Sequence, residues 1–179
     1  FAYQNARIII VRAHLLLLLL AGTPLCAQDK YQSKDFPVRN AYHGTLAQVR
    51  MNTKTAKRFR TVIREQAKEG VNFAGHFRIV GWGCGLGCTT HAIVDIRTGQ
   101  VYDVPYASVQ AIPDVRIPDP LRESAEIIKQ YSRFEFSIDS ELLVIGVVFN
   151  DDVFGVRYYR WHDNHLNLLL ELHPGVPPN

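Results

Sequence analysis

The hydrophobic positions of the chain follow a helical spacing in one short segment near residue 60. Apolar side chains recur every three or four positions from Ala56 to Ala67, and Thr53 or Thr55 precedes them as a capping residue. Gly70 follows at a position where it can end a helix. The pattern predicts one amphipathic helix whose apolar face packs on a sheet through Phe59, Val62, Ile63 and Ala67.

From residue 76 onward the apolar spacing changes to two, which is typical of half-buried strands. Turn residues divide this part of the chain into seven predicted strands, at 76–83, 89–96, 101–104, 134–138, 142–148, 155–161 and 166–172. The segment 105–130 is ambiguous, because its prolines favour a surface crossing whereas Asp119-Pro120 could start a short helix. We therefore predict an α+β fold, with the N-terminal helix packed on an antiparallel meander of about six to eight strands.

The first 27 residues have the parts of a secretory signal peptide. Arg7 and Arg12 precede an apolar run from Leu15 to Ala21, and helix-breaking residues follow the run. Because Arg12 and His14 interrupt it, the apolar stretch is shorter than the about 20 residues that cross a bilayer. The pattern predicts export rather than a membrane anchor.

Cleavage is predicted after Ala27, which leaves residues 28–179 as a single globular domain in the periplasm or outside the cell. Two alternatives stay open. One is a lipid anchor on Cys26, and the other is an uncleaved anchor or a cytoplasmic chain. The mature chain is predicted to contain no membrane span.

Removal of the signal peptide changes the charge balance. The whole chain of 179 residues has 20 Lys and Arg against 17 Asp and Glu, and residues 1–27 hold two of the basic residues and no acidic one. The mature chain is therefore close to neutral, and no nucleic acid is expected as a partner. The densest basic stretch is open to two interpretations, a solvated helix face or a contact with a membrane surface or an acidic partner. It comprises Lys54, Lys57, Arg58, Arg60, Arg64 and Lys68.

A glycine-rich loop joins the first two predicted strands and reads Gly81-Trp82-Gly83-Cys84-Gly85-Leu86-Gly87-Cys88. A hairpin centred on Leu86 sets Cys84 directly opposite Cys88 and Trp82 opposite Thr90. In an oxidising compartment this spacing predicts a disulfide, which would restrain the unfolded chain by roughly 2 kcal/mol. The alternating glycines leave one face of the strand end without side chains, so that a backbone or ligand can approach closely.

The residues of this loop and its neighbours suggest three other chemistries. Redox activity is disfavoured because a strand, not a helix, is predicted after Cys88. Zinc would need Cys84, Cys88, His91 and His76 together, but the hairpin register sets His91 on the face opposite the cysteines. A cysteine nucleophile with His91 or His76 as its base has no motif to support it. No glycine-rich phosphate-binding motif is present.

Several short motifs occur in an order that resembles a group of small uncharacterised exported bacterial proteins. They read NFAGHF at 72–77, WGCG at 82–85 with Cys88, AIVD at 92–95, Thr98-Gly99, and DSELLV at 139–144. The resemblance covers about residues 70–172. It implies a bacterial envelope location and an intact domain, and it carries no catalytic residue.

Two functional hypotheses follow from these patterns. The favoured one is a non-enzymatic binding module, without cofactor or metal, that contacts an envelope protein or a glycan through the disulfide-closed loop. The alternative is a small envelope enzyme or metal-binding protein that uses His76, His91 and the Cys84/Cys88 pair. The predicted binding surface comprises His76, Trp82, Gly83, Gly85, Leu86, Gly87 and His91.

Overall fold

The computed structural model describes residues 30–85, 88–106, 109–110, 133–148 and 154–172. The chain divides into two compact units, 1–30 and 31–179, and every element below belongs to the second unit. The predicted signal peptide, the Asp119-Pro120 helix start, Leu86 and Gly87 lie outside the described residues.

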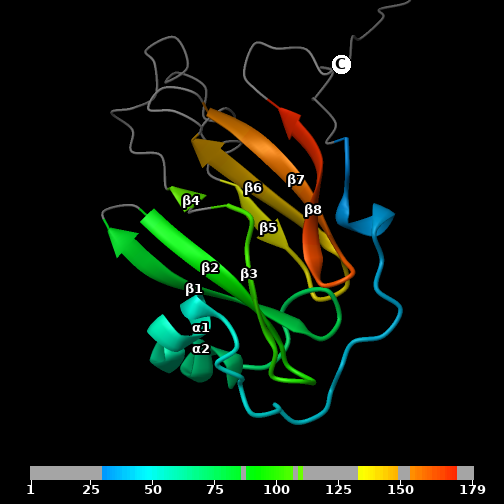
Figure 1. Ribbon diagram of the computed structural model, residues 1–179. Helices are drawn as coiled ribbons and strands as arrows, with labels where there is room; N and C mark the ends of the chain where they lie inside the picture. Colours follow the sequence, from blue (N-terminus) through cyan, green and yellow to red (C-terminus); the bar gives the residue numbers. More distant parts are fainter. Residues whose placement is uncertain (1–29, 86–87, 107–108, 111–132, 149–153, 173–179) are drawn as a thin grey trace, which may run out of the picture. The chain divides into compact units, whose positions relative to one another are not determined.

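The described strands form two antiparallel sheets (Figure 1). The first sheet has the order β1-β2-β3, and β4 pairs with β2 beyond the end of β3. The second sheet has the order β5-β6-β7-β8. The first contains β1 (Phe77–Gly85), β2 (Cys88–Asp95), β3 (Val101–Asp103) and β4 (Val109–Gln110). The second contains β5 (Phe134–Phe136), β6 (Leu142–Val148), β7 (Phe154–His162) and β8 (His165–Leu172).

The antiparallel, strand-rich character of the prediction is confirmed, but the strands do not form one meander. β4 pairs with β2 and therefore belongs to the first sheet. The next strand, β5, pairs with β6 and belongs to the second sheet. The seven predicted strands correspond to β1–β3 and β5–β8. β4 was not predicted, because it lies in the proline-rich segment 105–130, which has no regular spacing of apolar residues.

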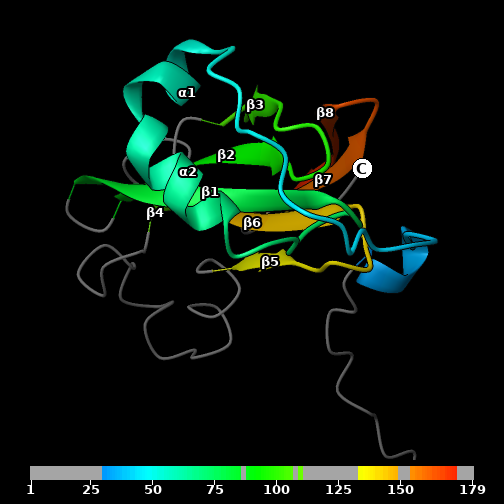
Figure 2. The same ribbon diagram turned by 90° about the horizontal axis from the view of Figure 1, so that it is seen from below.

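Two short helices occupy the segment where one continuous helix was predicted, namely α1 (Lys54–Arg58) and α2 (Arg60–Ala67). Thr53 caps α1, since its Oγ1 accepts a hydrogen bond of 2.9 Å from the backbone N–H of Ala56. The helical path breaks at Phe59, whose backbone (φ −107°, ψ 26°) is outside the helical region. Figure 2 shows α2 lying across β1. A single-turn 3-10 helix, η1 (Ser33–Asp35), precedes both.

The period of two in the strands separates three clusters of buried residues. One cluster lies between the sheets, where the rings of Phe77 and Trp161 meet edge to face at 4.8 Å. The opposite face of the first sheet packs against α1 and α2, with Ile63 and Ala67 fully buried. The third cluster covers the other face of the second sheet around Tyr158. The two sheets therefore share one core, and each has a second covered face.

Candidate functional site

The register of the β1–β2 hairpin agrees with the prediction as far as Gly83. Trp82 pairs with Thr90, and Val80 pairs with Ala92. A bulge then interrupts the ladder, so that Gly85 rather than Cys84 stands opposite Cys88. The predicted direct pairing of the two cysteines is wrong by this one residue. Gly85 has a φ of +145°, which favours glycine and explains why the bulge falls here.

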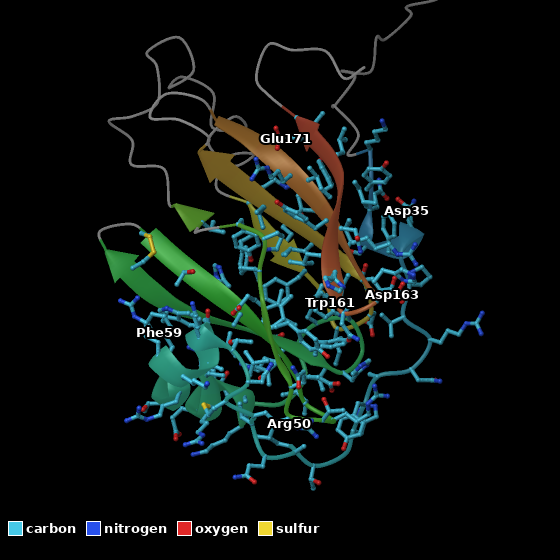
Figure 3. The ribbon with its side chains drawn as sticks, in the orientation of Figure 1. Asp35, Arg50, Phe59, Trp161, Asp163 and Glu171 are labelled. Carbon is cyan, nitrogen blue, oxygen red and sulfur yellow. A yellow bond between two sulfur atoms is a disulfide. The ribbon has the colours of Figure 1, made fainter. Side chains whose placement is uncertain are left out.

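The bulge still brings the two cysteines together. Their Cα atoms are 5.1 Å apart and their sulfur atoms are at bonding distance. Figure 3 shows the pair, in yellow, at the end of the hairpin. Gly83, Cys84 and Gly85 are exposed, and Cys88 is half-buried. We call these four residues the hairpin tip.

Trp82 supports the hairpin tip from the helix side of the sheet. Its ring stacks on that of Phe59 with the centroids 4.4 Å apart. The indole N–H is buried and has no hydrogen-bond partner among the described residues. Because the stack uses one face of the ring, Trp82 anchors the hairpin to the break between α1 and α2.

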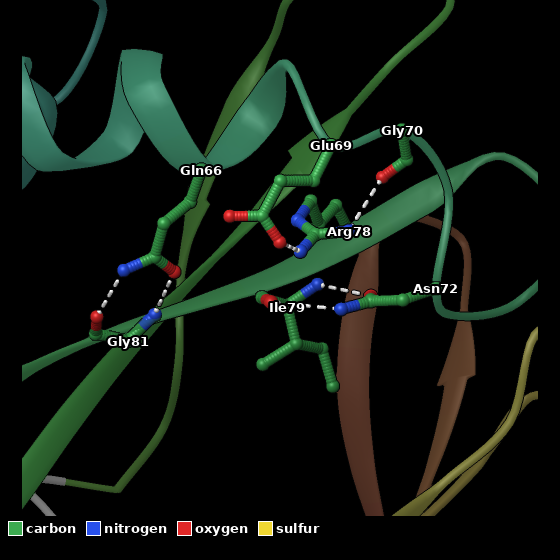
Figure 4. Close-up of polar contacts among 7 residues, drawn as sticks. All are labelled: Gln66, Glu69, Gly70, Asn72, Arg78, Ile79 and Gly81. Carbon is green, nitrogen blue, oxygen red and sulfur yellow. Dashed lines mark hydrogen bonds and ion pairs between the residues drawn. The ribbon is translucent and has the colours of Figure 1, made fainter.

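Side-chain amides cap the free edge of β1 (Figure 4). Asn72 exchanges two hydrogen bonds with the backbone of Ile79, at 2.8 and 3.1 Å. Gln66 does the same with Gly81, at 2.6 and 2.9 Å. These amides occupy the positions that a neighbouring strand would take, and they prevent edge-to-edge pairing along this stretch.

The capped stretch of the edge ends before the hairpin tip. Within the described part of the chain, no side chain hydrogen-bonds to the β1 backbone beyond Gly81. Arg78 strengthens the capped end, because its guanidinium donates to the carbonyl of Gly70 at 3.0 Å and pairs with Glu69. The edge of β1 is thus capped by side-chain amides at Ile79 and Gly81, and no described side chain caps it from Gly83 to Gly85.

His91 lies inside the molecule rather than on the predicted binding surface. It stands opposite Gly81 and fills the space that the glycine leaves, since a Cβ on Gly81 would lie 2.9 Å from His91 Cδ2. Its ring stacks on Phe134 at 4.4 Å, and only 7% of the residue is exposed. Burial lowers the pKa of His91 from its ordinary value of 6.5 to about 4. The bare face predicted from the glycines is therefore filled at Gly81.

His76 lies at the opposite end of β1 from Cys84. Its Nε2 is 3.2 Å from the Arg97 guanidinium and 4.0 Å from the Asp95 carboxylate. Burial lowers the pKa of His76; the Asp95 carboxylate opposes this shift, and the Arg97 cation adds to it. Asp95 is itself held by the turn after β2, where it accepts a hydrogen bond of 2.8 Å from the Thr98 hydroxyl.

The structure therefore distributes the predicted site residues over three places. Gly83 and Gly85 are at the hairpin tip, His91 is buried against Tyr106 and Phe134 beside the inter-sheet cluster, and His76 is at the far end of the hairpin. The four proposed zinc ligands are not brought together. In the ranges that the structure describes, no group of three or more His, Cys, Asp or Glu side chains is placed to hold a metal ion.

Comparisons with known proteins identify no relative of this chain. No protein-family model matches the chain, and no curated protein or solved structure is significantly similar to it. None of the helices in the described residues is long and apolar enough to cross a membrane.

Proposed function

We propose that this protein is an exported, non-enzymatic binding module whose contact surface is the hairpin tip. The observation that carries the proposal is the exposure of Gly83, Cys84 and Gly85 beside a cysteine pair at bonding distance. Export is proposed from the N-terminal segment, which has a basic start and a short apolar run.

The surroundings of the hairpin tip support recognition by a rigid surface. The Trp82–Phe59 stack holds one face of the hairpin, and the Gln66 amide holds the β1 edge up to Gly81. A disulfide between Cys84 and Cys88 would hold the end of the hairpin. A surface fixed in this way loses little conformational entropy on binding, which favours affinity.

A protein partner fits the hairpin tip better than a glycan does. Glycines, which carry no side chain, and a strand edge that no described side chain caps suit backbone-to-backbone hydrogen bonding with an extended segment. A glycan site would instead need an exposed aromatic ring on which a sugar can stack, and the ring of Trp82, which adjoins the hairpin tip in β1, already stacks on Phe59. We therefore take an envelope protein as the partner, with a glycan as the alternative outcome.

The alternative of an enzyme or metal-binding protein has less support in the geometry. His76 and Cys84 lie at opposite ends of β1, and eight residues of extended chain correspond to about 26 Å. His91 faces the inter-sheet core, and its imidazole Nδ1 has no hydrogen-bond partner among the described groups. A base and a nucleophile must be within hydrogen-bond reach of each other, and these residues are not.

Site-specific photocrosslinking in the exporting cell tests the proposed contact surface. A photoreactive side chain at Gly83 has open space around it, and one at Leu168, which is 52% exposed on β8, is the matched control. We expect one crosslinked envelope protein from position 83 and none from position 168. The crosslink should disappear in the Cys84→Ser/Cys88→Ser double variant, whose thermal melt shows that it is folded. Equal crosslinking at both positions, or none at position 83, would overturn the proposal.

A further inference from the structure

An open cavity of about 490 Å³ lies at the end of the first sheet opposite the hairpin tip. Three parts of the chain form its walls: the extended segment 47–51, the exposed side of α2, and the turn between β2 and β3. Its volume is in the range of small-molecule sites. The lining residues are Ala47, Gln48, Val49, Arg50, Met51, Arg64 and Thr98.

Backbone contacts fix one wall of this cavity. The N–H of Ala47 donates to the carbonyl of Ile96 at 3.0 Å, and the N–H of Arg50 donates to that of Gly99 at 2.7 Å. Gly99 has a φ of +74° and lies against the backbone of Gln48, where a Cβ would be 2.0 Å from the carbonyl oxygen. The segment that carries Arg50 is therefore seated directly on the β2–β3 turn.

The cavity has two positive charges and no negative charge in its lining. Arg50 and Arg64 are exposed, and neither makes an ion pair or a side-chain hydrogen bond with any described residue. Two carboxylates neighbour lining residues in the sequence or turn, and both are engaged: Asp95 is only 3% exposed and accepts the hydrogen bond of the Thr98 hydroxyl, and Glu65 pairs with Lys68. The sequence reinforces this charge, since residues 36–64 contain seven Lys and Arg and no Asp or Glu.

We propose that this cavity binds the phosphate group of a phosphate monoester through Arg50 and Arg64. A phosphate monoester carries between about −1.5 and −2 at neutral pH, which matches two guanidinium groups, whereas one carboxylate would leave a guanidinium uncompensated. Each guanidinium can donate two parallel hydrogen bonds to phosphate oxygens. Met51 adds an apolar wall for the organic part of the ligand.

The phosphate monoester can belong to a soluble metabolite or to a lipid headgroup, and the binding experiment separates the two sources. The soluble arm titrates the mature protein with glucose 6-phosphate, with inorganic phosphate as the minimal ligand, and follows heat of binding. The lipid arm measures cosedimentation with phosphatidylcholine vesicles that contain or lack phosphatidic acid. Saturable binding in the first arm indicates a soluble ligand, and binding only to vesicles with phosphatidic acid indicates a headgroup.

Matched arginine variants decide whether the cavity is the site. Arg50→Gln and Arg64→Gln should each weaken binding by about tenfold or more, because each removes charge-assisted hydrogen bonds. Arg60→Gln removes the same charge from an exposed position of α2 outside the cavity lining, and should leave the affinity within about twofold. Equal weakening by all three variants, or the absence of saturable binding in both arms, would overturn the proposal. The hairpin tip is not involved, so this result is independent of the proposed function.

Discussion

Replacement of Gly99 with alanine is expected to lower the free energy of unfolding by more than about 3 kcal/mol. The φ of +74° disfavours any residue with a Cβ, and the added methyl group would lie 2.0 Å from the Gln48 carbonyl oxygen and 2.7 Å from its carbon. Both atoms belong to the backbone and cannot move aside as a side chain could. The clash can therefore be relieved only if the segment 47–51 moves away from the β2–β3 turn. Urea denaturation of the wild type and Gly99→Ala measures the loss.

Gly70 provides the matched control for Gly99. Its φ is +84°, but a Cβ at this position would meet nothing within 4 Å. Gly70→Ala therefore has the conformational cost without the clash, and we expect a loss of only about 1 kcal/mol. If the two variants lose the same stability, the seating of segment 47–51 on the turn is not the tight contact described above.

Acidification from pH 6.5 to pH 4 is expected to destabilise the protein through His91. Its pKa is lowered to about 4 in the fold, whereas it is 6.5 in an unfolded chain. The unfolded chain therefore binds the proton first as the pH falls, and the free energy of unfolding decreases through this window and levels off below pH 4. The full pKa shift corresponds to a decrease of about 3 kcal/mol in the free energy of unfolding. We expect a decrease of about 2 kcal/mol, because solvent at the edge of the core weakens the effect.

A variant without a titratable ring isolates this effect. His91→Phe retains an aromatic ring against Phe134, and its free energy of unfolding should lose most of the pH dependence between pH 6.5 and 4. His76→Gln should retain most of it, although burial lowers the pKa of His76 in the same direction. Chemical denaturation at half-unit pH intervals provides the comparison. An unchanged slope in His91→Phe would show that His91 is not the group responsible.

The strands could be predicted from the sequence because each has its own alternation and its own turn. The predicted strand 142–148 has the same bounds as β6, and residues 97–100, which lie between the predicted strands 89–96 and 101–104, separate β2 from β3. The two-sheet arrangement could not be predicted, because it depends on which strands pair with each other, and the alternation within a strand does not specify its neighbours. The helical period likewise continues through Phe59, so it does not reveal the break between α1 and α2.

The candidate site was predictable only in part. The approach of Cys84 to Cys88 follows from hairpin spacing, but the bulge does not, because alternating glycines allow several registers. The sequence places His91 near the loop, but its register opposite Gly81 puts its side chain on the other face from the cysteines, and this register explains why His91 is not part of the binding surface. The edge cap formed by Gln66 could have been predicted from the sequence. Gln66 is a polar residue on the same helix face as the apolar residues Ile63 and Ala67, which indicates that its amide has a buried partner.

The central claim is that an exported chain presents a hairpin tip closed by Cys84 and Cys88. The most direct test is the intact mass of the protein recovered from its own host without reductant, before and after reduction. We predict a chain that begins at Gln28, that is two hydrogen atoms lighter before reduction, and that reacts with iodoacetamide only after reduction. A chain in which both thiols react with iodoacetamide before any reduction would contradict the claim.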